Sequence, residues 1–205
     1  MTSSDHQFSL NQWPTRTLGV AAVVVVVYCG QLIAAGSLDP TAAYRVATEF
    51  QGSIGAGTVV FSWLLHSSHT HILGNLCVFL VAGWWVETRI DGDRYLLGVA
   101  IGLGIGANVA ALVVFSEGGL GLSCVTAGLV AMVALGAFQW LSEHSRVDWL
   151  VIVLAVGAVL WLSVSVGVLG GLSPGTAVWV HRFGVVFGVV WYVVERGRYG
   201  FQKSS

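Results

Sequence analysis

Charged residues are scarce in this chain of 205 residues. Only 9% of its residues are Asp, Glu, Lys or Arg, and the formal net charge at pH 7 is −1. An average soluble domain is roughly a quarter charged, so this chain has too little charged surface to cover a fold that is surrounded by water. The few Lys and Arg residues form no cluster, which argues against a nucleic-acid partner.

Cysteine is also rare. The three cysteines, Cys29, Cys77 and Cys124, are an odd number and lack the spacing of a metal site. Each lies within a long apolar stretch, where we interpret it as an apolar side chain that fills space. The cysteines therefore carry no information about the redox compartment, and we expect no cofactor.

Long apolar stretches are what the chain has in abundance. Hydrophobic residues make up 56% of it, and its 27 glycines and nine tryptophans are typical of membrane helices. The mean hydropathy is +0.81. A membrane span needs about 20 mostly apolar residues. Six stretches meet this requirement, namely residues 18–36, 69–87, 95–115, 123–141, 148–170 and 177–194.

These stretches predict an all-α, polytopic membrane protein with six transmembrane helices. They form one domain, residues 18–194, between short tails at residues 1–17 and 195–205. The first stretch follows Arg16 and ends in small residues, as a secretory signal would. Its length and the five spans after it favour a retained helix. The lipid bilayer is therefore the first predicted partner.

The positions of Lys and Arg predict how the chain is oriented, because cytoplasmic loops carry an excess of these residues. On one face, the tails and the loops after the second and fourth spans contain Arg16, Arg89, Arg94, Arg146, Arg196, Arg198 and Lys203. The loops on the other face contain only Arg45. We therefore expect a multi-pass protein of the cell membrane with both termini in the cytoplasm.

With this orientation, several polar residues lie at one depth near the outer surface. Ser123 begins the fourth span after a glycine-rich segment, and His181 lies about one turn into the sixth span. His71 and Asn75, near the start of the second span, are four residues apart and share a helix face. A serine, a histidine that acts as its base and two possible oxyanion donors are the minimum equipment for hydrolysing a peptide bond.

Each of these residues also has an ordinary structural interpretation. Ser123 follows a glycine-rich loop and could be the N-cap of the fourth span. His181 could hydrogen-bond across helices, although an ionisable residue inside a membrane is a functional candidate by default. Asn75 could join two helices in the same way. The joint pattern is what favours chemistry over three separate structural roles.

The run from residue 66 to residue 71 offers a third kind of interpretation. It contains His66, His69 and His71, which could belong to a metal or haem site or to a transport path. A zinc site, however, needs three or four converging ligands, and no carboxylate or cysteine stands nearby. If His71 is an oxyanion donor instead, His66 and His69 match no donor position, and their replacement should have milder effects.

Three motifs resemble those of the rhomboid family of intramembrane serine proteases. Residues 65–76, Leu-His-Ser-Ser-His-Thr-His-Ile-Leu-Gly-Asn-Leu, resemble its second helix, where a histidine precedes an asparagine by four residues and a glutamate, here Glu87, lies near the helix end. Gly-Leu-Ser at residues 121–123 resembles its nucleophile motif. Residues 180–188 are similar to its sixth helix, whose glycines after the histidine would allow close packing against the fourth span.

The resemblance covers roughly residues 60–190 and implies a six-helix bundle with a water-filled cavity open to the outside. It implies a serine endopeptidase that cleaves the transmembrane segments of other proteins. Ser123 would be the nucleophile and His181 the base, in a dyad without a carboxylate. His71, Asn75 and the backbone amide of Ser123 would be the oxyanion donors. The residues agree, because no carboxylate expected on the outer face is spaced to orient His181.

Two positions depart from the family pattern. The residue after the nucleophile is usually glycine, and here it is Cys124. Four residues after the serine, the family usually has an aromatic side chain that stacks on the histidine, whereas this chain has Ala127. These departures favour the alternative to a protease, a proteolytically inactive rhomboid-like protein that binds membrane clients.

Overall fold

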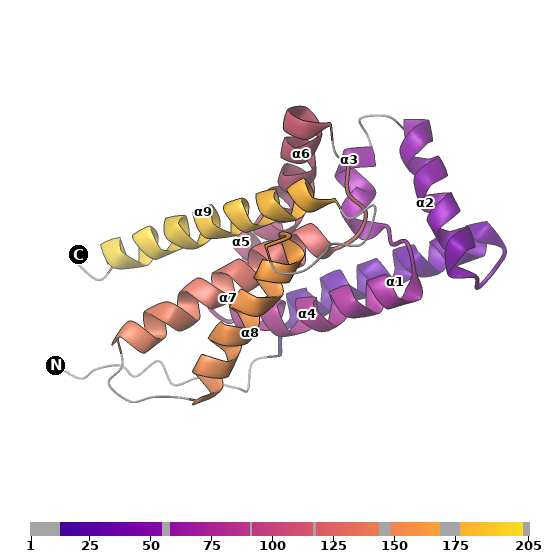
Figure 1. The fold of residues 1–205 in the computed structure, drawn as a ribbon. Coiled ribbons are helices and arrows are strands. Elements are labelled where there is room, and N and C mark those ends of the chain that lie inside the picture. Colours follow the sequence, from indigo (N-terminus) through magenta and orange to yellow (C-terminus); the bar gives the residue numbers. More distant parts are fainter. Residues whose placement is uncertain are drawn as a thin grey trace.

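A computed structural model describes residues 13–54, 58–90, 92–116, 118–143, 149–168 and 177–202. These residues form helices and no strand, which confirms the predicted all-α class (Figure 1). The helices are α1 (Thr15–Ala35), α2 (Pro40–Ile54), α3 (Thr58–Phe61), η2 (Ser62–Leu64), α4 (His69–Glu87), α5 (Gly92–Leu97), η3 (Gly98–Gly106), α6 (Ala107–Phe115), α7 (Ser123–Glu143), α8 (Trp149–Ser165) and α9 (Val178–Gln202).

Six helical rods correspond to the six predicted spans. Five of them are long and apolar enough to cross a membrane: α1, α4, α7, α9 and the continuous run of α5, η3 and α6. The middle of this run, η3, is π-helical. The sixth rod, α8, is a shorter apolar helix. The described chain therefore has the build of a polytopic membrane protein.

The fifth predicted span, residues 148–170, was too long, because α8 ends at Ser165. Gly167 adopts a φ of 78°, which glycine permits. The amides of Gly167 and Val168 turn back to carbonyls in the last turn of α8, at 3.1 and 2.8 Å. This is a Schellman ending. The last carbonyls of the helix, those of Ser165 and Val166, are then left without intrahelical partners.

The loop between the first two spans contains α2, a helix that the sequence analysis did not predict. It begins after Asp39, whose carboxylate accepts a hydrogen bond from the amide of Thr41 at 2.9 Å. Pro40 occupies the first helical position, where proline is favoured. Ala43 and Ala47 are fully buried. The signals for this helix are therefore an acidic N-cap and a proline, rather than a long apolar run.

α7 is the central helix of the bundle, and α9 lies beside it (Figure 1). The buried residues of α7 lie between Cys124 and Ala137. Glycines make the contact with α9: a Cβ on Gly184 would overlap the carbonyl oxygen of Cys124, and one on Gly188 would overlap that of Gly128. The two backbones are therefore closer than side chains would permit. This is the close approach that the glycines after His181 predicted.

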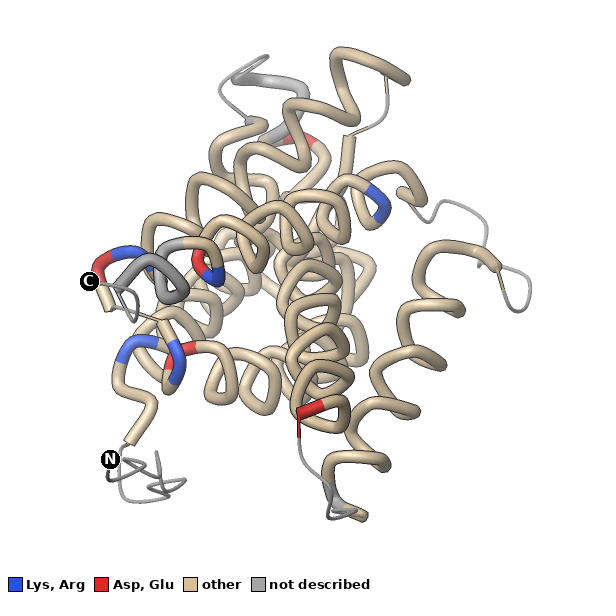
Figure 2. The backbone as a smooth tube through the Cα atoms, turned by 90° about the vertical axis from the view of Figure 1, so that its left-hand side faces the viewer, with Lys and Arg blue, Asp and Glu red and all other residues tan. Residues whose placement is uncertain are grey.

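Charged residues gather at one end of the bundle, near the start of α1 and the end of α9 (Figure 2). Glu87, at the end of α4, accepts hydrogen bonds from the amides of Arg16 and Thr17 at 3.0 and 2.8 Å. This carboxylate thereby satisfies the first amides of α1. Arg94 on α5 lies 3.4 Å from the buried carboxylate of Glu195 on α9. The starts of α4, α7 and α9 lie at the opposite end.

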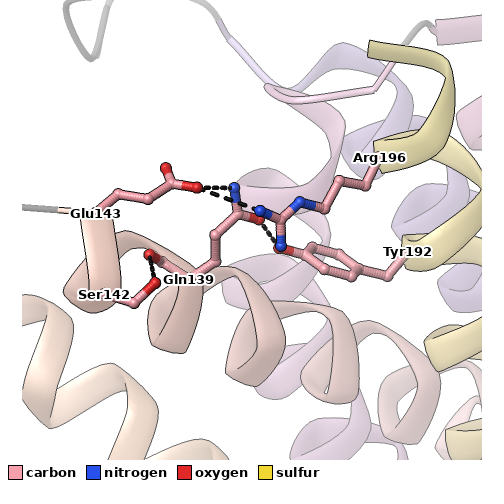
Figure 3. Close-up of polar contacts among 5 residues, drawn as sticks. All are labelled: Gln139, Ser142, Glu143, Tyr192 and Arg196. Atoms are coloured by element: carbon pink, nitrogen blue, oxygen red, sulfur yellow. Dashed lines mark hydrogen bonds and ion pairs between the residues drawn. The ribbon is translucent and has the colours of Figure 1, made fainter. Parts of the chain in front are cut away.

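A polar network joins α7 and α9 at the charged end (Figure 3). Tyr192 on α9 donates a hydrogen bond to the side-chain oxygen of Gln139 on α7. Glu143 accepts hydrogen bonds from Gln139 at 2.7 Å and from Arg196 at 3.2 Å. Hydrogen bonds therefore hold the two helices together at this end, while glycines allow them to touch nearer the other end.

We expect the glycine contact to be sensitive to a single methyl group. Gly188→Ala places a Cβ against the carbonyl of Gly128, and such overpacking typically costs about 1–3 kcal/mol. Gly197→Ala, on the same helix, is the control, because a Cβ there meets nothing within 4 Å. The midpoint of thermal unfolding in detergent should fall for Gly188→Ala and stay level or rise for Gly197→Ala. Equal responses would contradict the packing described above.

Candidate active site

Ser123 and His181 meet between the starts of α7 and α9. Oγ of Ser123 lies 2.8 Å from Nε2 of His181, a normal distance for a hydroxyl that donates to an imidazole. Both residues are partly buried. The structure thus brings together the two residues predicted as nucleophile and base. The N-cap interpretation of Ser123 does not account for this contact.

A backbone carbonyl fixes the other side of the imidazole. Nδ1 of His181 lies 2.8 Å from the carbonyl oxygen of Ser165, the last residue of α8. A carbonyl can only accept, so Nδ1 carries the ring proton and Nε2 presents its lone pair to Ser123. This is the tautomer that a general base needs. A helix end therefore occupies the place that a carboxylate has in the Ser-His-Asp triad.

Two side-chain nitrogens converge beside the loop that precedes Ser123. A Cβ on Gly121 would stand 3.0 Å from Nε2 of His71 and 3.2 Å from Nδ2 of Asn75. Gly121 has a φ of 96°, which also favours glycine. Oγ of Ser67 lies 2.8 Å from Nδ1 of His71. When this hydroxyl donates to Nδ1, the ring proton is on Nε2, which faces Gly121 as a donor.

Nδ2 of Asn75 is a buried donor without a hydrogen-bond partner. The residue is only 7% exposed. Buried polar groups nearly always have a partner, and an unsatisfied one costs about 1–3 kcal/mol. A bond between helices, the ordinary interpretation of this asparagine, would have satisfied the amide. A free donor is instead what a site needs if it is to receive an oxygen atom during a reaction.

The loop before Ser123 is held by η2 and by the residues that follow η2. The amide of Gly121 donates to the carbonyl of Ser62 at 3.0 Å, and that of Leu122 donates to Nε2 of His66 at 3.4 Å. Burial lowers the pKa of His66 to about 4, so the ring is neutral at pH 7 and can accept. Gln31 binds the backbone of His66 twice, at 3.0 and 3.1 Å. The motifs predict only a mild effect of replacing His66, whereas in the structure its ring supports this loop.

The three histidines between residues 66 and 71 do not converge on a common point. Nδ1 of His69 lies 2.8 Å from the hydroxyl of Tyr28, and its Nε2 lies 2.9 Å from the carbonyl of Leu38. The rings of His66 and His71 are 5.3 Å apart. No group of three or more His, Cys, Asp or Glu side chains in the described part of the chain could hold a metal ion. The metal interpretation therefore has no ligand set in these residues.

The two residues that depart from the rhomboid pattern are both fully buried. Sγ of Cys124 lies 3.5 Å from the side-chain nitrogen of Asn108 on α6 and 4.0 Å from the carbonyl oxygen of Gly104 on η3. Ala127 has only a methyl group where the pattern has an aromatic ring. The hydrogen bond from His181 to the carbonyl of Ser165 therefore orients the imidazole from a different helix.

A comparison with known families agrees with the motifs. The family model described as Rhomboid domain matches residues 55–198, which is more than half of the chain. This range begins before η2 and ends within α9, so it contains Ser123, His181, His71 and Asn75. A comparison with curated proteins finds no match.

Proposed function

This chain belongs to the rhomboid family of membrane proteins, and we propose that it is an intramembrane serine protease that cuts transmembrane segments of other proteins. The observation that carries the proposal is the 2.8 Å hydrogen bond between Oγ of Ser123 and Nε2 of His181. A serine hydroxyl is a weak nucleophile unless a base takes its proton, and the hydrogen bond supplies that base. The bundle of apolar helices supports a site inside the bilayer.

The first chemical step transfers an acyl group from the substrate to Ser123. As Oγ attacks the scissile carbonyl carbon, a C–O bond forms and the hydroxyl proton moves to Nε2 of His181. The imidazolium then gives this proton to the leaving nitrogen, and the C–N bond breaks. The carbonyl of Ser165 supports the positive ring, because a helix C-terminus carries partial negative charge.

Neutral donors would stabilise the negative charge on the substrate oxygen. The side chains of His71 and Asn75 flank the space beside Gly121, and the unpartnered Nδ2 of Asn75 supports this role. The backbone amide of Ser123 is a third donor, since the first amides of a helix lack intrahelical partners and carry partial positive charge. Donors that are already in place need no reorganisation during the reaction.

Water completes the cycle. It attacks the acyl carbon and gives a proton to Nε2 of His181, the C–O bond to Ser123 breaks, and the proton returns to Oγ. Water must therefore reach the site from one membrane face. The basic residues at the opposite end, such as Arg16, Arg94 and Arg196, favour a cytoplasmic location for that end. We thus place both termini in the cytoplasm and the site near the outer face of the cell membrane.

A second candidate function is that of an inactive relative that binds membrane clients without cutting them. The presence of Cys124 and Ala127 favours it, because both positions differ from the family pattern beside the nucleophile. Binding alone, however, requires neither an imidazole held in one tautomer nor an unsatisfied amide at Asn75. These two features support the protease.

Reaction with a fluorophosphonate probe tests the protease, because the probe modifies only an activated serine. We expect the purified wild-type protein to be labelled, and Ser123→Ala and His181→Ala each to lose labelling. The double variant should be no worse than either single one, since members of one catalytic unit are strongly non-additive. Ser142→Ala, an exposed serine at the charged end, is the control. Labelling that persists in Ser123→Ala would locate the reactive serine elsewhere, and a folded wild type without labelling would favour the inactive relative.

Asn75→Ala tests the oxyanion site. Loss of one donor should lower the turnover of a fluorogenic transmembrane peptide by roughly 10² to 10³. The thermal midpoint should not fall, because the buried donor that is removed has no partner in the resting protein. Cys77→Ala, on the exposed side of the same helix, is the control for α4. Full turnover in Asn75→Ala would remove this residue from the mechanism.

A further inference from the structure

Two neighbouring side chains of α9 hold the end of α8. Nδ1 of His181 donates to the carbonyl of Ser165 at 2.8 Å, and the next residue, Arg182, donates from Nε and Nη2 to the carbonyl of Val166 at 3.3 and 3.2 Å. These carbonyls are free to accept because the helix ends in a Schellman turn at Gly167. Consecutive residues of one helix thus bind consecutive carbonyls of another.

The guanidinium of Arg182 is itself held by an aromatic side chain. Its central carbon lies 4.5 Å from the ring centre of Trp179, a distance typical of a cation–π contact. Trp179 stacks on Phe115 at the end of α6, with 3.7 Å between ring centres and an angle of 8° between ring planes. α6, α8 and α9 therefore meet around a single cation. An arginine whose only role was to bind lipid headgroups would require neither the hydrogen bonds to Val166 nor the contact with the ring of Trp179.

The orientation of His181 depends on where the end of α8 lies. Ala127 supplies no aromatic ring to the imidazole, and the carbonyl of Ser165 lies 2.8 Å from its Nδ1. A carbonyl at a helix end can orient a ring only if the helix end is fixed. The two hydrogen bonds from Arg182 to Val166, one residue further along, fix it next to the ring.

We propose that Arg182 is a positioning residue of the active site. By holding the carbonyl end of α8 against α9, it keeps the oxygen of Ser165 on Nδ1 of His181, and it thereby keeps Nε2 turned to Ser123. The proposal rests on the protease function and adds to it the device that stands in for the aromatic ring absent at Ala127. Arg182 acts through the orientation of His181 and does not contact the reacting atoms. Its loss should therefore lower the rate of the chemical step and leave binding unchanged.

The kinetics of fluorophosphonate labelling separate these two effects. Arg182→Met keeps the apolar stem of the side chain and removes the donors. We expect the maximal rate constant of inactivation to fall roughly tenfold to a hundredfold, the loss that misplacement of a catalytic group causes, and the half-saturating probe concentration to stay unchanged. Arg182→Lys, which keeps a cationic donor, should recover most of the loss. Arg45→Met is the matched control, since Arg45 is an exposed arginine on α2 that lies 3.9 Å from Glu49 and takes no part in the contact between α7 and α9.

Nitrogen-15 NMR of histidine-labelled protein reads the tautomer without any need for activity. His181→Gln identifies the signals of His181. In the wild type we expect a protonated Nδ1 and an unprotonated Nε2, and in Arg182→Met a mixture of both tautomers. Trp179→Leu, which removes the ring beneath the guanidinium, should change the signals in the same direction and serves as a second variant if Arg182→Met does not fold.

An unchanged rate constant and an unchanged Nδ1 signal in Arg182→Met would overturn the proposal while the protease function stands. A higher half-saturating concentration at an unchanged rate constant would also overturn it, because Arg182 would then be a binding residue. Absence of labelling in the wild type would instead count against the protease function, and the NMR signals of the variants would still decide the role of Arg182.

Discussion

The close approach of α7 and α9 is the constraint on which the proposed active site depends. Ser123 and His181 lie at the starts of two neighbouring helices, so the distance between their side chains is set by the distance between the two backbones. The glycines at positions 128, 184 and 188 remove the side chains that would keep these backbones apart. The polar network at the other end keeps the helices from spreading (Figure 3). A larger residue at any of these glycines would therefore act on the site through the packing, without contact with substrate.

In the proposed mechanism, neutral groups and helix ends stabilise the charges that develop during the reaction. A buried carboxylate inside a bilayer is costly, and in this structure a backbone carbonyl, that of Ser165, lies against Nδ1 of His181. The carbonyl end of α8 provides partial negative charge beside His181, and the amide end of α7 provides partial positive charge beside Ser123. His71 and Asn75 add donors without adding ions. Such fixed dipoles act strongly where water is excluded, and they require no charged partner to be buried.

The sequence predicted those features that depend on hydropathy and on helical spacing. Long apolar runs define the spans, and the shared depth of span starts explains why Ser123 and His181 could be paired before the structure was known. α2 was missed because it has only 15 residues and is not uniformly apolar. The fifth span was predicted too long because hydropathy continues past Gly167, whereas the backbone turns there. The contributions of His66 and of the Ser165 carbonyl depend on tertiary contacts, and a backbone carbonyl has no signature in a sequence.

Cleavage of a single-span reporter in proteoliposomes is the most direct test of the proposed activity. The purified protein and a panel of reporters whose spans contain small and helix-breaking residues would be reconstituted together, and mass spectrometry would locate the cut. We predict cleavage within the span, toward the face on which Ser123 lies, by the wild type and none by Ser123→Ala. Cleavage that continues in Ser123→Ala, or cuts that fall only outside the spans, would contradict an intramembrane serine protease.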